Sequence, residues 1–125
     1  MRIVVVEDEA PIREGMAKLL SKINPEYELV GKAADGEAGY QLIRELNPDL
    51  VIMDIRMPKM DGIAMMKKLR EENIKCKVII LSAYSEFQYA QKAIELKADS
   101  YLLKPIKIPE LKSALKQAER EISED

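Results

Sequence analysis

The sequence contains no histidine among its 125 residues, and this absence excludes several kinds of chemistry. Triads of the Ser-His-Asp and Cys-His type need an imidazole base, and many zinc sites need imidazole ligands. A phosphate-carrying histidine within the chain is excluded as well. Chemistry at this chain must therefore use carboxylates, hydroxyls and lysines.

Cysteine, long apolar runs and surplus basic charge are also scarce. The single cysteine, Cys76, excludes an internal disulfide and a zinc site built from cysteines. No apolar run approaches the ~20 residues of a membrane span, and the apolar run at the N-terminus is too short for a signal peptide. We therefore expect a cytoplasmic protein. The 20 Lys and Arg against 22 Asp and Glu leave no basic excess for binding nucleic acid.

Short apolar runs alternate with helical patterns five times, which predicts an α/β fold with a parallel sheet covered by helices on both faces. The length fits one domain, residues 1–125. We expect strands at residues 3–6, 28–33, 50–54, 77–82 and 100–104. We expect helices at residues 11–23, 37–46, 62–72, 86–97 and 108–122. The polar residues of the second strand indicate an edge position, and the apolar first, third and fourth strands indicate central ones.

Polar groups stand where four of these strands end: Glu7, Asp8, Asp54, Ser82 and Lys104. Sites in open α/β sheets form at the carboxyl ends of the strands, so we expect these side chains to meet. Three acids in one crevice repel one another, and Mg²⁺ would offset that repulsion. A nucleophilic aspartate beside a metal, a lysine and a hydroxyl is a constellation for phosphoryl transfer.

Each of these residues also has an ordinary interpretation when it is taken alone. Asp8 or Asp54 could cap the helix that follows it, and Ser82 could be a turn residue. Lys104 could simply face solvent. Their coincidence at four strand ends favours the site.

The motifs around these residues resemble those of a known family. They are the acidic pair after "IVVV", the stretch "DLVIMDIRMPKMDG", "LSAY" and "YLLKP". Over essentially its full length the chain is similar to the receiver domain of response regulators in two-component signalling. The resemblance implies a (βα)5 flavodoxin-like three-layer sandwich with a five-stranded parallel sheet. The strand order 2-1-3-4-5 is the one typical of that fold.

The resemblance also implies a role for each residue of the metal site. Asp54 matches the phosphoacceptor. Asp8 matches the direct ligand of Mg²⁺ (or Mn²⁺), and the backbone carbonyl of Arg56 matches another protein ligand. Glu7 matches an acid that acts through water, although aspartate is commoner there.

Three further positions match residues that act on the phosphoryl group or respond to it. Ser82 matches the hydroxyl that bonds the phosphoryl group, and Lys104 matches the lysine that pairs with it. Tyr101 matches a switch residue that turns inward when Ser82 moves. The Lys104–Pro105 bond is typically cis in this family.

The function implied is a phosphorylation-controlled switch and not an enzyme with an external product. A partner histidine kinase would donate the phosphoryl group. The fourth helix, fifth strand and fifth helix would then change their surface, form a homodimer and control an output such as transcription. Residues 82–106 look like receivers that precede an AraC-type DNA-binding domain. We expect a domain of a longer regulator, with a stand-alone receiver as the alternative, and DNA contact only through an output domain.

Two other functions fit the sequence poorly. A phosphatase of the haloacid dehalogenase type needs a second aspartate two residues after the nucleophile, and Arg56 occupies that position. A nucleotide or flavin binder needs glycine in its first turn, and "VEDEAP" has none. A receiver that has lost its phosphate chemistry is a third alternative, but every required residue type is present.

Two regions suggest finer properties of the switch. Arg56 and Tyr84 are bulky where they would flank the phosphoryl group, so we hypothesise a long-lived phosphorylated state. On the first helix, Arg13, Met16 and Ala17 are candidates for contact with the kinase.

Overall fold

Five parallel strands form the central sheet of the computed structural model, which describes residues 1–83 and 87–124. The strands are β1 (Arg2–Val6), β2 (Glu28–Ala33), β3 (Leu50–Met53), β4 (Lys77–Ser82) and β5 (Ser100–Leu103). Their order is β2-β1-β3-β4-β5, as the resemblance implied. The prediction that the second strand lies at an edge and that the first, third and fourth are central is also confirmed.

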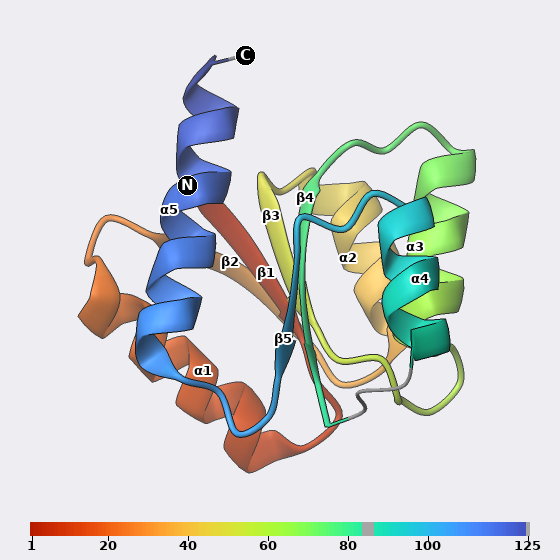
Figure 1. Ribbon diagram of the computed structural model, residues 1–125, viewed down its shortest axis with the longest axis horizontal. Coiled ribbons are helices and arrows are strands. Elements are labelled where there is room, and N and C mark those ends of the chain that lie inside the picture. The colour runs from red at the N-terminus through yellow and green to blue at the C-terminus, as the bar shows by residue number, and fades with distance from the viewer. Residues whose placement is uncertain (84–86, 125) are drawn as a thin grey trace.

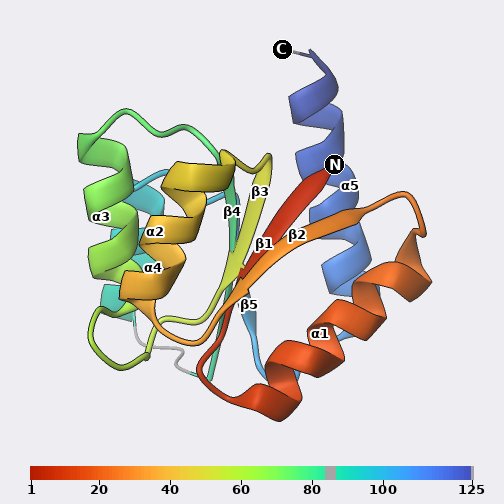
Figure 2. The same cartoon turned by 180° about the vertical axis from the view of Figure 1, so that it is seen from behind.

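Helices cover both faces of this sheet and complete a three-layer sandwich (Figure 1). They are α1 (Ala10–Ile23), α2 (Gly36–Leu46), α3 (Gly62–Glu71), α4 (Phe87–Glu95) and α5 (Ile108–Glu124). The opposite view shows α1 and α5 on one face and α2, α3 and α4 on the other (Figure 2). None of the helices that the structure describes combines the length and the apolar character needed to span a bilayer.

Alternate residues of the three central strands supply two separate apolar cores. This arrangement follows from the strand period of two, which sends successive side chains to opposite faces. The core under α1 and α5 takes Ile3, Val5, Leu50, Ile52, Ile79 and Leu81. The core under α2, α3 and α4 takes Val4, Val6, Val51, Met53, Val78 and Ile80. The centres of these three strands contribute only apolar side chains to the two cores, so the polar groups of the central strands lie at their ends.

Two strands end one residue earlier than predicted. β3 ends at Met53 and not at Asp54, and β5 ends at Leu103 and not at Lys104. The backbone N–H of Asp54 still bonds the Val6 carbonyl at 3.2 Å, and the Lys104 N–H bonds the Ser82 carbonyl at 2.8 Å. Both side chains, of Asp54 and Lys104, therefore stand at the first position beyond their strands.

The ends of the helices follow from local side chains and backbone conformation. Asp35 and Asp61 accept the N–H groups of Ala38 and Ala64 at 2.8 Å, which caps α2 and α3. The cap at Asp61 was predicted. α4 ends two residues before the predicted position 97, where the backbone is left-handed with φ 63°. Ser85, the predicted cap of the fourth helix, lies outside the described residues.

Two glycines inside helices offer a test of how closely α2 approaches the sheet. A Cβ atom on Gly39 of α2 would lie 2.8 Å from both Val6 methyl groups, whereas a Cβ atom on Gly15 of α1 would meet nothing within 4 Å. We expect Gly39→Ala to lower the free energy of unfolding by about 1–3 kcal/mol through overpacking. We expect Gly15→Ala to raise it by about 0.5–1 kcal/mol through helix propensity. Urea unfolding midpoints of the two variants measure both effects, and shifts of the same sign would contradict the packing argument.

Candidate functional site

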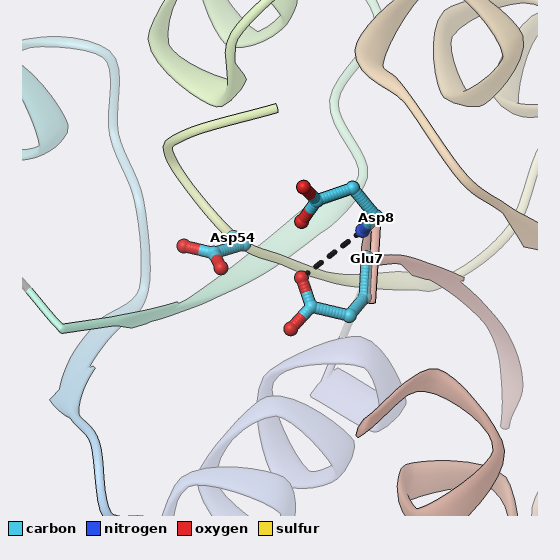
Figure 3. Close-up of side chains that lie close together, drawn as sticks. All are labelled: Glu7, Asp8 and Asp54. Atoms are coloured by element: carbon cyan, nitrogen blue, oxygen red, sulfur yellow. Dashed lines mark hydrogen bonds between the residues drawn. The ribbon is translucent and has the colours of Figure 1, made fainter. Parts of the chain in front are cut away.

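The acidic residues predicted at the strand ends do meet at the carboxyl edge of the sheet. Glu7 and Asp8 follow β1, and Asp54 follows β3. One carboxylate oxygen from each lies within 4.8 Å of the others. Figure 3 shows the three carboxyl groups gathered in one place, although 46 positions of sequence separate Asp8 from Asp54. The parallel topology alone brings these two segments together.

Lys104, which follows the edge strand β5, contacts two of these acids. Its ammonium lies 2.8 Å from Asp54 Oδ2 and 2.9 Å from Glu7 Oε1. The side chains of Glu7, Asp54 and Lys104 are only 6%, 12% and 19% exposed. Because so little water screens them, the attraction between these charges is stronger than in an exposed ion pair.

The pKa values of Glu7 and Lys104 are both raised, for different reasons. Burial raises the pKa of Glu7 to about 7, the hydrogen bond from Lys104 opposes that rise, and the Asp54 charge adds to it. Burial alone would lower the pKa of Lys104, but its hydrogen bonds to Asp54 and Glu7 and their charges raise the pKa overall. Lys104 therefore carries its positive charge throughout the physiological range.

Backbone N–H groups fix the orientation of the two paired acids. Glu7 Oε2 accepts the N–H of Asp8 at 3.1 Å, and Asp54 Oδ1 accepts the N–H of Ile55 at 2.7 Å. In each acid, then, one oxygen bonds a backbone amide and the other bonds Lys104. The carboxylates are held in place before any ligand arrives.

The donor set fits a hard divalent cation. The three acids offer carboxylate oxygens, which Mg²⁺ prefers over nitrogen and sulfur ligands. Three carboxylates and one ammonium leave two net negative charges when all four groups are ionised, and one divalent cation offsets that charge. Receiver domains, which the sequence resembles, generally bind Mg²⁺ at an acidic pocket of this kind.

The remaining predicted residues lie around this group at the same edge or near it. Ser82 is fully buried as the last residue of β4. Arg56 is exposed in the loop after β3, and its guanidinium lies 3.4 Å from the hydroxyl of Tyr89 on α4. Tyr101 of β5 is half-buried against the core under α2, α3 and α4. The Lys104–Pro105 peptide bond is cis, as the resemblance implied.

Gly62 has a role at the site that its sequence position did not reveal. In the sequence it is a turn residue after "MPKMD", but in the structure its N–H bonds the Ile55 carbonyl at 2.7 Å. A Cβ atom at Gly62 would lie 2.3 Å from the carbonyl oxygen of Asp54. In the sequence, "MDG" indicates only a turn, and the pattern does not predict the contact between Gly62 and the Asp54 carbonyl.

Two of the three first-helix residues predicted as candidates for contact with the kinase turn toward the protein interior. Met16 is buried in the core under α1 and α5, so it cannot present itself to a partner. Arg13 turns inward, and its Nη1 donates to the Glu7 carbonyl at 2.7 Å. Tyr84, predicted to flank the phosphoryl group, lies outside the described residues.

Residues 3–116 match the family described as the response regulator receiver domain. The chain belongs to this family. Receiver domains are signalling modules and not conventional enzymes. The expected class of function is thereby confirmed at the level of the family.

Relatives of this receiver domain include named regulatory proteins. The nitrate/nitrite response regulator NarL of Escherichia coli K12 is 34% identical over 116 residues, which are 93% of this chain and 53% of that protein. The positive alginate biosynthesis regulatory protein of Pseudomonas aeruginosa is 38% identical over 120 residues, 96% of this chain and 48% of that protein. The chain spans about half the length of the curated relatives it matches.

A solved structure, described as a LuxR-family DNA-binding response regulator from Staphylococcus aureus, is also similar. Its TM-score is 0.87 at 30% identity, with 94% of this chain and 97% of that chain covered. The predicted AraC-type output domain is not supported, because the relatives point to the LuxR type. The motif in residues 82–106 that suggested it lies within the receiver and does not encode an output domain.

The bridge made by Lys104 can be tested by removing its charge. In Lys104→Met, Glu7 and Asp54 would face each other without the ammonium. We expect the free energy of unfolding in EDTA to fall by about 2–3 kcal/mol, slightly less than for a fully buried pair. We also expect excess Mg²⁺ to recover part of that loss, so that its stabilising effect exceeds the effect on the unchanged protein.

Urea unfolding with EDTA and with Mg²⁺ measures both quantities. Lys77→Met is the matched control, because Lys77 pairs with Asp99 and Glu121 away from this group. Equal stabilisation by Mg²⁺ in Lys104→Met, Lys77→Met and the unchanged protein would contradict the bridge.

Proposed function

We propose that this receiver domain, residues 1–125, is a phosphoacceptor switch that receives a phosphoryl group on Asp54 from a phosphohistidine of a partner kinase. The observation that carries this proposal is the position of Lys104, whose ammonium bonds both Asp54 and Glu7. A carboxylate held beside a fixed ammonium and two further acids is suited to accept a phosphoryl group next to a metal ion.

In the proposed reaction a carboxylate oxygen of Asp54 forms a bond to phosphorus. The bond between phosphorus and the imidazole nitrogen of the kinase breaks, and that nitrogen takes up a proton. Lys104 moves its hydrogen bond toward the phosphoryl oxygens, whose negative charge exceeds that of the original carboxylate. The site is arranged before the reaction, so little reorganisation opposes the transfer.

Mg²⁺ would be held by the carboxylates of Asp8 and Asp54 and by the backbone carbonyl of Arg56, with Glu7 acting through water. When bound, the ion offsets negative charge on the phosphoryl oxygens. The orientation of Glu7 and Asp54 by backbone N–H groups supports this arrangement.

Ser82 and Tyr101 would carry the response to phosphorylation. The Ser82 hydroxyl would donate to a phosphoryl oxygen, and its movement would let Tyr101 turn further inward. The strand register places Tyr101 beside Ile80, two residues before Ser82. This proximity would allow a movement of Ser82 to affect Tyr101 directly.

The proposed output surface consists of α4, β5 and α5. It carries three of the exposed apolar side chains of the described chain, Ile94, Leu103 and Ile108, at 76%, 46% and 46% exposure. Apolar groups left in water favour association, so we propose that this surface forms a homodimer on phosphorylation. Transcription would be controlled through a DNA-binding output domain, for which the LuxR-family relative is the guide. Because DNA is the proposed target, the place of action would be the cytoplasm.

Phosphorylation of Asp54 can be tested with a small phosphodonor. Incubation with acetyl phosphate and Mg²⁺ should add one phosphate, seen by intact mass, and Asp54→Asn should abolish the adduct. Asp61→Asn is the control, because it removes a carboxylate from the same loop while asparagine keeps the cap of α3. An adduct that persists in Asp54→Asn, or none in the unchanged protein, would defeat the proposal.

The lifetime of the phosphoryl group is the test for Arg56. We propose that its side chain hinders the attacking water, so Arg56→Asn should shorten the half-life on the order of tenfold, or about 1.4 kcal/mol of barrier. Lys59→Asn, an exposed change in the same loop, should leave the half-life unchanged. The decay of the adduct by intact mass gives both values. A half-life of seconds in the unchanged protein would count against this role.

A further inference from the structure

The side chain of Arg13 returns from the first helix to the strand end that carries the acidic pair. Its Nη1 donates to the Glu7 carbonyl at 2.7 Å, and the side chain is only 18% exposed. The cap residue of α1, Glu9, makes no side-chain bond to the helix. Arg13 therefore supplies a direct side-chain connection between the start of α1 and the end of β1.

This connection acts on the peptide that joins the two acids. The carbonyl of that peptide accepts Arg13, and its N–H, which belongs to Asp8, donates to Glu7 Oε2 at 3.1 Å. The preceding N–H, of Glu7, bonds the Ala33 carbonyl of β2 at 3.0 Å. Both ends of the peptide plane are thus fixed, and with them the direction in which the Asp8 side chain leaves the backbone.

The length of Glu7 makes this arrangement possible. Its carboxylate folds back to the next N–H with one oxygen while the other oxygen reaches Lys104. Glu7 is thereby held in a buried position, whereas its neighbour Asp8 is exposed beside the same group (Figure 3). Within this pair, Asp8 is the acid open to direct contact with a metal ion, and the direction of its side chain depends on the fixed peptide.

We infer that Arg13 is a positioning residue for the metal pocket, acting through the Glu7 carbonyl to aim Asp8 at the cation. This inference rests on the proposed function, since it presumes that the pocket takes Mg²⁺. Groups that orient metal ligands without touching the metal typically contribute 10- to 100-fold in affinity.

The sign of the effect separates positioning from simple electrostatics. A positive guanidinium near the pocket repels a divalent cation, so on charge alone its removal would tighten metal binding. If Arg13 positions Asp8, its removal weakens binding in spite of the favourable change in charge. The two explanations therefore predict opposite shifts.

The test uses the full chain with Arg13→Met, and Lys18→Met as the control for loss of one positive charge from an exposed position of α1. Mn²⁺ binding is followed by electron paramagnetic resonance, with Mg²⁺ as competitor. We expect Arg13→Met to raise the Kd of both ions about 10- to 100-fold and Lys18→Met to leave it nearly unchanged. Arg13→Gln is a second neutral variant if the Met variant does not fold, as judged by urea unfolding in EDTA.

A second measurement needs no metal. Amide hydrogen exchange at Asp8, followed in EDTA, should be faster in Arg13→Met than in Lys18→Met, because the peptide loses the bond at its carbonyl. Unchanged or tighter Mn²⁺ binding, or unchanged exchange at Asp8, would overturn the inference while the Asp54 adduct still upheld the proposed function. An unchanged protein that binds no metal would overturn both.

Discussion

The contact of one ammonium with two nearly buried carboxylates is the constraint around which this receiver domain is arranged. Two acids at neighbouring strand ends repel each other, and burial makes that repulsion costly unless a positive group stands between them. Lys104 fills this position from β5, which is separated from β3 by β4. Its side chain must cross the end of β4, where the chain carries the small residues Ser82 and Ala83. The long side chain of lysine is what lets one ammonium reach both acids from this strand.

Much of the fold followed from the pattern of apolar residues. The runs at the centres of β1, β3 and β4 have no polar interruptions, so their burial and central places in the sheet were predictable. The meeting of Glu7, Asp8, Asp54 and Lys104 was also predictable, because parallel strands bring their carboxyl ends to one edge. The ends of β3 and β5 were each placed one residue too late, because Asp54 and Lys104 keep one backbone bond of the sheet after regular pairing has stopped.

Other features had no periodic signal and could not be predicted. The inward turn of Arg13 depends on the distance between the start of α1 and the end of β1, and an amphipathic pattern records only which face of a helix is apolar. The contact between Gly62 and the Asp54 carbonyl depends on the path of a loop. The output domain was misjudged for a different reason, since a receiver's own fourth helix and fifth strand do not contain the residues that read DNA.

The glycine that closes the loop after β3 divides that loop into two parts with different freedom to change. Its base, formed by Ile55 and Gly62, is buried against the Asp54 backbone, and even one added methyl group would collide there. Its rim, formed by Arg56, Pro58 and Lys59, is exposed to solvent. Substitutions in the rim can therefore change the surface beside the site without moving the Asp54 backbone, whereas a larger side chain at the base would displace it. One short segment thus tolerates substitution at its exposed residues and resists it at its buried ones.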